Sequence, residues 1–369
     1  MLAVVQTSDA PQDIAFLDAD NDGPDNSDDN PNFRPDEDGG NSGRENIFKF
    51  GISTASGSQA LESSEQVGSL DVQQDASGST YTRLYATQWE SGTDLRFFLN
   101  ALEDNATNGT SVNGSNTNNG PDINSSAPMG TLENSNRITI GNGTKGALGS
   151  DGWSGDIAEI IVFRSSLNAA QRRIINTYLV EKYGLTTDAS AEVESYAFGA
   201  TFFNDFAGIG QASDGTQHTA AQSGELQLGI PSSGGFSDGD FVLFGHDADA
   251  SGSFAAVSSG PLAADADNDG RADAERMSRT WRANLTGTTP LTIEATVASS
   301  DLPPSTTGYD YVAIVDDASD FSNDPTVYDL TGSGTLTGEI DVEAGQYITL
   351  GAVKRVVQFD ALTASAFEA

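Results

Sequence analysis

Gly155-Asp-Ile-Ala-Glu-Ile-Ile-Val-Phe163 is the clearest strand pattern in the chain. Side chains alternate between the two faces of a β-strand, so Ile157 and Ile161 lie on one face and Ile160 lies on the other. Both faces of this segment are largely apolar, and a strand with two apolar faces is typical of the centre of a sheet. We therefore expect residues 155–164 to form a central strand.

A helix is predicted directly after this strand. Asn168 is a suitable N-cap, and Gln171 follows it at the capping-box spacing. Gly184 is suited to the left-handed position that ends a helix. Between the caps, apolar residues recur at helical spacing and form one stripe, which we expect to pack on a β-sandwich: Ile174, Ile175, Tyr178, Leu179 and Tyr183.

Composition predicts that the rest of the chain is all-β. The 369 residues include 40 glycines, together with many Ser, Thr, Asn and Asp, which suits short strands joined by turns. The length allows two domains. We expect a first sandwich over residues 1–185, a polar linker over 186–195 and a second β domain over 196–355. The strands expected in the second domain are Phe241–Gly245, Arg279–Leu285, Leu291–Val297, Tyr309–Val315, Thr335–Val342 and Gln346–Val353.

Charge and rare residues exclude several classes of function. The chain has 17 basic and 54 acidic residues, a formal charge of −37, which repels nucleic acid and anionic membranes. It has no cysteine and two histidines, so thiolate chemistry is excluded and the usual zinc sites lack ligands. No apolar run approaches the roughly 18 residues of a membrane span. These properties are compatible with a calcium-rich extracellular or cell-surface location, for which any export signal would lie outside this sequence.

Two acidic hexapeptides are the most specific chemical feature. Asp18-Ala-Asp20-Asn-Asp22-Gly23 and Asp265-Ala-Asp267-Asn-Asp269-Gly270 repeat the same pattern. Carboxylates at alternate positions before a turn-forming glycine direct several hard oxygens towards one Ca²⁺ ion. We expect calcium to order residues 18–38, an acidic and proline-rich stretch that would otherwise repel itself.

These loops resemble thrombospondin type 3 and related calcium repeats. The resemblance implies that the ligands in the first loop are Asp18, Asp20, Asp22, Asp25 and Asp29, with Asp29 at the twelfth position of the loop. In the second loop, within residues 265–276, it implies Asp265, Asp267, Asp269 and Asp273. There the twelfth position is Arg276, and Glu275 is the nearest carboxylate, so the second loop departs from the pattern.

A second resemblance covers the strand and helix described above. Gly155–Phe163, Leu167–Gln171 and Tyr178-Leu-Val-Glu-Lys-Tyr-Gly-Leu185 resemble the closing strand and helix of bacterial laminin G-like, concanavalin A-like domains. This implies a jelly-roll sandwich that binds glycans or proteins without transforming them. The first strands of that family are missing before Leu2, so the chain looks truncated at its N-terminus.

The second domain is also similar to known sequences. Phe202–Gly210, Val242–Asp247, Arg279–Arg282 and Gly345–Gly351 are similar to an uncharacterised β domain that follows such sandwiches in bacterial surface proteins. No activity comes with this resemblance. The tail over residues 356–369 resembles the opening strand of a Calx-beta or immunoglobulin-like repeat, which implies that further modules follow.

The function expected from these features is a non-catalytic, calcium-stabilised adhesion or structural module. Two alternatives stay open: a filament subunit that assembles by β-strand addition, and a glycoside hydrolase that uses Glu339, Asp341 and Glu343, because alternation places these carboxylates on one strand face. The candidate ligand contacts are Trp153 with Asp151, in a loop, and Trp89, on a strand face with Tyr81 and Tyr85, where core packing is the commoner role of aromatic residues.

Overall fold

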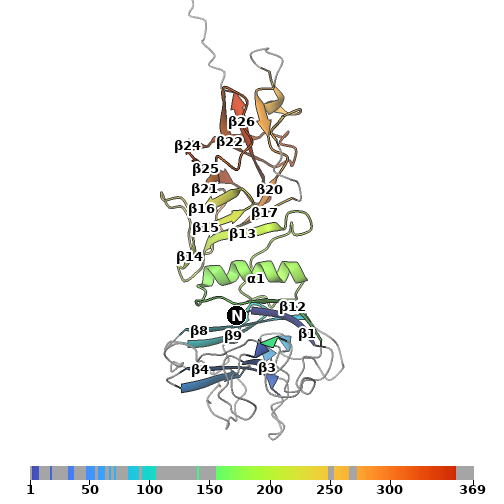
Figure 1. Ribbon diagram of the computed structural model, residues 1–369, viewed down its shortest axis with the longest axis vertical. Coiled ribbons are helices and arrows are strands. Elements are labelled where there is room, and N and C mark those ends of the chain that lie inside the picture. Colours follow the sequence, from blue (N-terminus) through green and yellow to red (C-terminus); the bar gives the residue numbers. More distant parts are fainter. Residues whose placement is uncertain are drawn as a thin grey trace, which may run out of the picture. The chain divides into compact units, whose positions relative to one another are not determined.

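The computed structural model describes residues 2–7, 17–18, 32–36, 47–54, 57–62, 66–67, 70–71, 82–90, 94–104, 139–140, 155–247, 253–265 and 272–354. These residues form antiparallel sheets and a single α-helix, which confirms the all-β prediction (Figure 1). The chain divides into two compact units. Unit 1 comprises residues 1–168 and 175–193, and unit 2 comprises residues 169–174 and 194–369.

Unit 1 contains two five-stranded sheets. The first has the order β10 (Leu102–Glu103), β9 (Asp94–Leu99), β8 (Thr82–Glu90), β1 (Leu2–Thr7) and β12 (Gly155–Ile161). The second has the order β11 (Thr139–Ile140), β2 (Leu17–Asp18), β3 (Asn32–Asp36), β4 (Ile47–Thr54) and β5 (Gly57–Glu62). A separate pair joins β6 (Gln66–Val67) to β7 (Leu70–Asp71).

The first sheet of unit 1 is buried on both faces. One face carries Leu2, Val4 and Leu84, which pack with Leu179 of the helix. The alternate residues Ala3, Val5, Tyr85, Phe97 and Leu99 are also buried, and the second sheet lies beside this face, with β5 next to β9 (Figure 1). Tyr85 is 3% exposed and therefore belongs to the core of the sandwich, and this burial raises its pKa.

The expected central position of residues 155–164 is wrong. Among the described strands, β12 pairs with β1 alone and lies at the edge of the first sheet. Ile157 and Ile160 are half-buried although β12 is an edge strand. Ala158 is exposed and lies at a bulge, where the register between β12 and β1 shifts. An edge strand of a sandwich can therefore be apolar on both faces, because a helix covers one face and a sheet the other.

The predicted helix is confirmed as α1, Ala169–Tyr183, and Gly184 has the expected left-handed φ of 60°. The first residues of α1, up to Ile174, belong to unit 2, and the rest belong to unit 1. No helix among the described residues has the length and hydrophobicity to cross a membrane.

The segment after α1, which we expected to be a linker, belongs to unit 1 as far as Val193. The amide nitrogen of Glu192 donates to the carbonyl oxygen of Ala101 at 2.7 Å. The Asn100 side chain donates to the carbonyl oxygen of Thr186 at 2.7 Å and accepts from the amide of Leu84 at 2.7 Å. Asn100 is fully buried, so one side chain ties this segment to β8.

Unit 2 is a sandwich of two sheets. The larger sheet contains β13 (Asn204–Gln211), β14 (Gln217–His218), β17 (Phe241–His246), β18 (Ala255–Ala256), β19 (Ala274–Arg276), β20 (Trp281–Thr286), β22 (Tyr309–Asp316), β23 (Thr326–Asp329) and β26 (Tyr347–Lys354). The smaller sheet has the order β15 (Ala220–Ser223), β16 (Leu226–Gly229), β21 (Leu291–Ala298), β25 (Thr335–Val342) and β24 (Thr331–Ser333). A short 3₁₀ helix, η1 (Pro261–Ala263), precedes β19. All six strands predicted here are confirmed to within two residues at each end.

The core of unit 2 lies between these two sheets. Along β21 every second residue is buried, from Leu291 to Val297, and β25 contributes Ile340 and Val342 in the same way. Leu330, also in this core, joins β23 of the larger sheet to β24 of the smaller one. This simple alternation explains why the strands of unit 2 were readable from the sequence.

Candidate functional site

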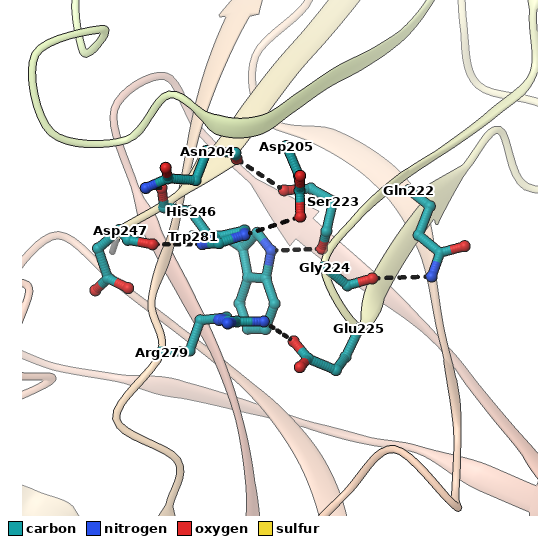
Figure 2. A network of polar contacts seen from close by, with 10 residues as sticks. All are labelled: Asn204, Asp205, Gln222, Ser223, Gly224, Glu225, His246, Asp247, Arg279 and Trp281. Atoms are coloured by element: carbon teal, nitrogen blue, oxygen red, sulfur yellow. Dashed lines mark hydrogen bonds and ion pairs between the residues drawn. The ribbon is translucent and has the colours of Figure 1, made fainter. Parts of the chain in front are cut away.

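A network of polar contacts lies at one end of the unit 2 sandwich (Figure 2). It joins four segments: the start of β13, the turn between β15 and β16, the end of β17, and the segment that enters β20. We call it the His246 network, and its residues are Asn204, Asp205, Gln222, Ser223, Gly224, Glu225, His246, Asp247, Arg279 and Trp281.

His246 is the central side chain of this network. It is 6% exposed, and both ring nitrogens face oxygen atoms. Nε2 lies 3.2 Å from the Asp205 carboxylate, and Nδ1 contacts the carbonyl oxygen of Asp247. The ring also meets the indole of Trp281 edge to face, with 6.2 Å between centroids. Neither ring nitrogen is thus directed at open space, as a general base requires.

Asp205 has an uncommon backbone conformation. Its φ is 47°, a left-handed value that non-glycine residues adopt rarely, although Asp tolerates it better than most. The register between β13 and β17 is irregular between Asn204 and Ala207, so the residue lies at a bulge. The bulge directs the largely exposed Asp205 side chain, 67% accessible, to the buried imidazole of His246.

The turn between β15 and β16 supplies the next contacts. Ser223 pairs with Leu226, so Gly224 and Glu225 form a two-residue loop, and Gly224 has a φ of 56°. Glycine at the first position of such a loop is typical of hairpin turns. The indole nitrogen of Trp281 donates to the carbonyl oxygen of Ser223 at 2.8 Å. A Cβ on Gly224 would lie 2.9 Å from Nη1 of Arg279, so glycine is required for close approach as well.

Glu225 and Arg279 form a largely buried ion pair. Nη1 of Arg279 donates to Oε2 of Glu225, and the two side chains are 16% and 15% exposed. A buried ion pair resists the loss of either partner, because the remaining charge is left in a poorly solvated place. The pair therefore holds the β15–β16 turn against the entry to β20.

The first acidic loop lies almost entirely outside the described residues. Of its predicted ligands, Asp18 lies at the end of β2 and its side chain is not described. Asp20, Asp22, Asp25 and Asp29 are outside the described residues, and so are Asp151 and Trp153. The roles of these residues as calcium ligands or ligand contacts therefore stay predictions.

Trp89 lies near the end of β8 and is partly buried. Its indole nitrogen is buried and meets no hydrogen-bond acceptor among the described residues. Tyr85, which lies on the same strand as Trp89, is buried in the core. The position of Trp89 is thus at the margin of the core, and its proposed contact with a ligand stays a prediction.

The second acidic loop is described at both ends. Asp267 and Asp269 lie outside the described residues. The amide of Asp273 donates to the carbonyl oxygen of Ala264 at 2.7 Å, and the carbonyl oxygen of Asp273 accepts from the amide of Lys354 at 2.8 Å. Asp265 and Asp273 therefore stand at the two ends of a loop that the backbone closes.

Glu275 has a separate set of contacts. Its two carboxylate oxygens accept from the amide and the hydroxyl of Thr306, at 2.7 and 2.8 Å. Both bonds connect β19 to the segment before β22. Among the described residues, no three Asp, Glu or His side chains gather closely enough to hold a metal.

The carboxylates considered for glycoside hydrolysis are exposed. Glu339 and Asp341 point out of β25, and Glu343 lies in the turn after it, since β25 ends at Val342. Glu339 accepts from the Ser233 hydroxyl at 3.2 Å, and Asp341 accepts from that of Thr292 at 2.5 Å. The three side chains are thus spread along a solvated sheet face and its end.

The comparisons with known proteins give one match. Residues 171–346 match the model of a family described as a domain of unknown function (DUF8202). The matched range begins within α1, runs through unit 2 as far as the start of β26, and covers less than half of the chain. No curated protein and no solved structure matches this chain.

Sequence reasoning missed the His246 network as a unit. The segments Val242–Asp247 and Arg279–Arg282 carried a resemblance to an uncharacterised β domain, and this resemblance implied no contact between them. The contact between His246 and Trp281 arises from the register of β17 with β20, which pairs these two residues directly. Part of this network has a sequence signal: His246 directly follows the predicted strand Phe241–Gly245, and Arg279 begins the predicted strand Arg279–Leu285.

Proposed function

We propose that this chain is a non-catalytic, calcium-stabilised adhesion or structural module of an extracellular or cell-surface protein, which binds a glycan or a protein. The observation that carries the proposal is the closed base of the second acidic loop. Two backbone hydrogen bonds hold Asp273 between Ala264 and Lys354. Carboxylates from both ends of the loop are therefore kept near one another.

Electrostatics supports a cation at this loop. Asp265, Asp267, Asp269 and Asp273 lie within nine consecutive residues with Arg271 as the only basic side chain. Closure of the backbone at Asp273 limits how far the carboxylates of Asp265 and Asp273 can separate, so repulsion between them persists until a cation binds. Ca²⁺ takes six to eight oxygen ligands, which carboxylates, backbone carbonyls and water supply together.

A structural role also agrees with the chemistry of the His246 network. A general base needs a nitrogen or oxygen that can reach a substrate proton. Both nitrogens of His246 contact oxygens of the protein, and the Arg279–Glu225 pair is largely buried. The network therefore supports a role in holding four segments of unit 2 together.

The experiment is a calcium titration of the full chain, followed by its melting temperature and by hydrogen exchange. Sites of extracellular modules have dissociation constants of about 10⁻⁴ to 10⁻³ M. Calcium at about 100 times the dissociation constant would stabilise the folded state by about 2.7 kcal/mol. For a unit of this size we expect the melting temperature to rise by about 5–10 °C.

Variants separate the second loop from the first. The Asp265→Asn and Asp273→Asn double variant should lose the calcium-dependent protection from exchange over residues 257–276 and keep any protection over residues 18–38. Asp301→Asn is the matched control, since Asp301 is exposed and its carboxylate contacts the neighbouring Ser300 hydroxyl. Equal melting temperatures in calcium and in chelator would refute the calcium part of the proposal.

The edge position of β12 favours a second candidate, self-association by β-strand addition. An unpaired edge presents backbone donors and acceptors to another chain. Ala158→Lys adds a charge at the exposed bulge of β12, and Ala220→Lys is the same change on an exposed position of β15. Light scattering should show oligomers of the unchanged chain and of Ala220→Lys, and a monomer for Ala158→Lys. A monomer at every concentration excludes this candidate.

The hydrolase alternative is tested by an assay with β-glucans. We expect no hydrolysis, because Glu339 points out of β25 to solvent and Glu343 lies in the exposed turn after this strand. Glu339→Gln and Glu343→Gln should behave as the unchanged chain does. Hydrolysis that either substitution abolishes would contradict the non-catalytic proposal.

A further inference from the structure

The loop between β22 and β23 contains Asp324-Pro325, the one Asp–Pro bond in the sequence. An Asp–Pro bond is chemically the weakest kind of peptide bond, because the aspartic carboxyl can attack its own carbonyl carbon and the proline nitrogen is a good leaving group. Whether such a bond breaks in a folded protein depends on how its backbone is held.

The backbone of Asp324 has an unfavourable conformation. Its φ is 154°, and non-glycine residues avoid positive φ values. The residue before a proline is restricted further, to φ of about −120 ± 40°. The φ of Asp324 is thus unfavourable for a non-glycine residue and lies outside the narrower range of a residue before proline. Breaking the bond after Asp324 therefore relieves strain.

The loop on the N-terminal side of Asp324 is held by Asp316. This carboxylate is 3% exposed. One oxygen accepts from the amide of Ala318 at 3.1 Å, and the other accepts from the amide of Asn323 at 3.0 Å. The residue directly before Asp324 is therefore fixed by two hydrogen-bonded turns that share one buried side chain.

Two further contacts hold the middle of this loop. Phe321 is fully buried with a φ of 59°, and the guanidinium of Arg276 lies 4.8 Å above its ring. The backbone of Gly260 lies so close that a Cβ there would be 2.6 Å from the Cα of Ser322. The loop therefore cannot easily rearrange to relax Asp324.

On the C-terminal side, Thr326 begins β23 and pairs with Val315 of β22. The bond between Asp324 and Pro325 thus lies between two fixed points. The Asp324 side chain is exposed and makes no hydrogen bond or ion pair within the described part of the chain. Its carboxyl is available to its own carbonyl carbon, and water has access.

We propose that Asp324–Pro325 is a self-cleavage site. A carboxyl oxygen of Asp324 attacks the carbonyl carbon of Asp324, the bond to the Pro325 nitrogen breaks, and the electron pair leaves with that nitrogen. The carboxyl proton moves to the nitrogen through water, which leaves a secondary amine and a five-membered cyclic anhydride. One water molecule opens the anhydride to two carboxyl groups, so the net reaction is hydrolysis.

The two pieces stay together after cleavage. Residues after Pro325 form β23 to β26, which pair with strands of both sheets, and they supply Ile340, Val342, Ile348 and Leu350 to the core. The processed protein is therefore a two-chain unit 2, in which everything after Pro325 is held by packing and strand pairing. It elutes at its original size and separates in denaturant.

The test compares folded and unfolded full-length chain at the same pH. Both are incubated at about pH 4 to 5, where part of the aspartic carboxyls carry a proton, at the lowest pH at which circular dichroism still shows native strands. Intact mass should reveal residues 1–324 and 325–369. Release of the strain at Asp324 should make cleavage about tenfold or more faster in the folded chain than in guanidinium. Equal or slower cleavage in the folded chain overturns the proposal.

Variants assign the reaction to these residues. Asp324→Glu keeps the charge but requires a six-membered anhydride, and Pro325→Ala removes the good leaving group; both should lower the rate at least tenfold. Both positions lie outside the core, so folding should persist. Asp316→Asn should lower the folded rate to that of the unfolded chain, while Asp317→Asn, an exposed neighbour, should not. An unchanged rate in Asp324→Glu and Pro325→Ala overturns the mechanism.

Discussion

Arg279→Met should destabilise unit 2 more than any single surface substitution. Glu225 is 15% exposed and lies against Nη1 of Arg279, so the substitution leaves a carboxylate charge in a poorly solvated turn. Loss of one partner from a fully buried pair costs about 3–5 kcal/mol. The residual exposure of both side chains reduces this, and we expect a cost of about 2–3 kcal/mol.

A double-mutant cycle gives the energy of the pair itself. Glu225→Met alone leaves the Arg279 charge without this partner and should cost about 2 kcal/mol. The Arg279→Met and Glu225→Met double variant replaces the pair with apolar side chains of similar volume, which is often nearly neutral. The double variant should therefore be more stable than either single variant, with a coupling energy of about 4–5 kcal/mol, close to the sum of the two single costs.

The assay is urea unfolding followed by tryptophan fluorescence and by hydrogen exchange of unit 2. Urea is uncharged, so it leaves the ion pair unscreened. A cost of 2–3 kcal/mol should lower the melting temperature of a unit of this size by about 4–12 °C. Arg164→Met, at an exposed position, is the control and should change little. If the two single costs simply add in the double variant, the argument from burial is wrong.

Three further predictions concern single positions. Asn100→Ala should cost about 3–5 kcal/mol in urea unfolding, because it leaves the Leu84 amide and the Thr186 carbonyl without their partner and places alanine at a φ of 44°; a cost below 1 kcal/mol would contradict this. Burial lowers the pKa of His218 below its ordinary 6.5, so the unfolded state binds more protons and stability falls as pH falls below about 6.5. The melting temperature of His218→Gln should therefore decrease less than that of the unchanged chain between neutral and mildly acidic pH, and parallel curves would refute the effect. Gly208→Ala should cost about 1–3 kcal/mol by calorimetry, since its Cβ would lie 2.5 Å from a leucine methyl in the packed interior; an unchanged melt would show that this interior is loosely packed.

Local patterns predicted the secondary structure well. The helix over Ala169–Tyr183 and its end at Gly184 follow from spacing and from one glycine conformation, both of which depend on neighbours within a few residues. The strands of unit 2 follow from strict alternation, as along β21. In both cases the pattern of buried and exposed side chains can be recognised from residues that are close in the sequence.

Positions that depend on distant partners were not predicted. Apolar residues on both faces of β12 indicated a central strand, yet β12 lies at the edge of its described sheet. The sequence shows how apolar a strand is, but it does not show which strands pair with it. The His246 network has the same origin, since β17 and β20 are 35 positions apart from His246 to Trp281 and meet only through sheet register.

The sequence alone determined the all-β class, the single helix, the strong negative charge and the acidic hexapeptides, because composition and short-range periodicity are properties of neighbouring residues. Only the tertiary structure decided which strands pair, that Asp205 and Glu225 meet His246 and Arg279, and that Asp316 fixes the loop before Pro325. These contacts join residues that the chain keeps apart, and packing of the sandwich core is what brings them within bonding distance.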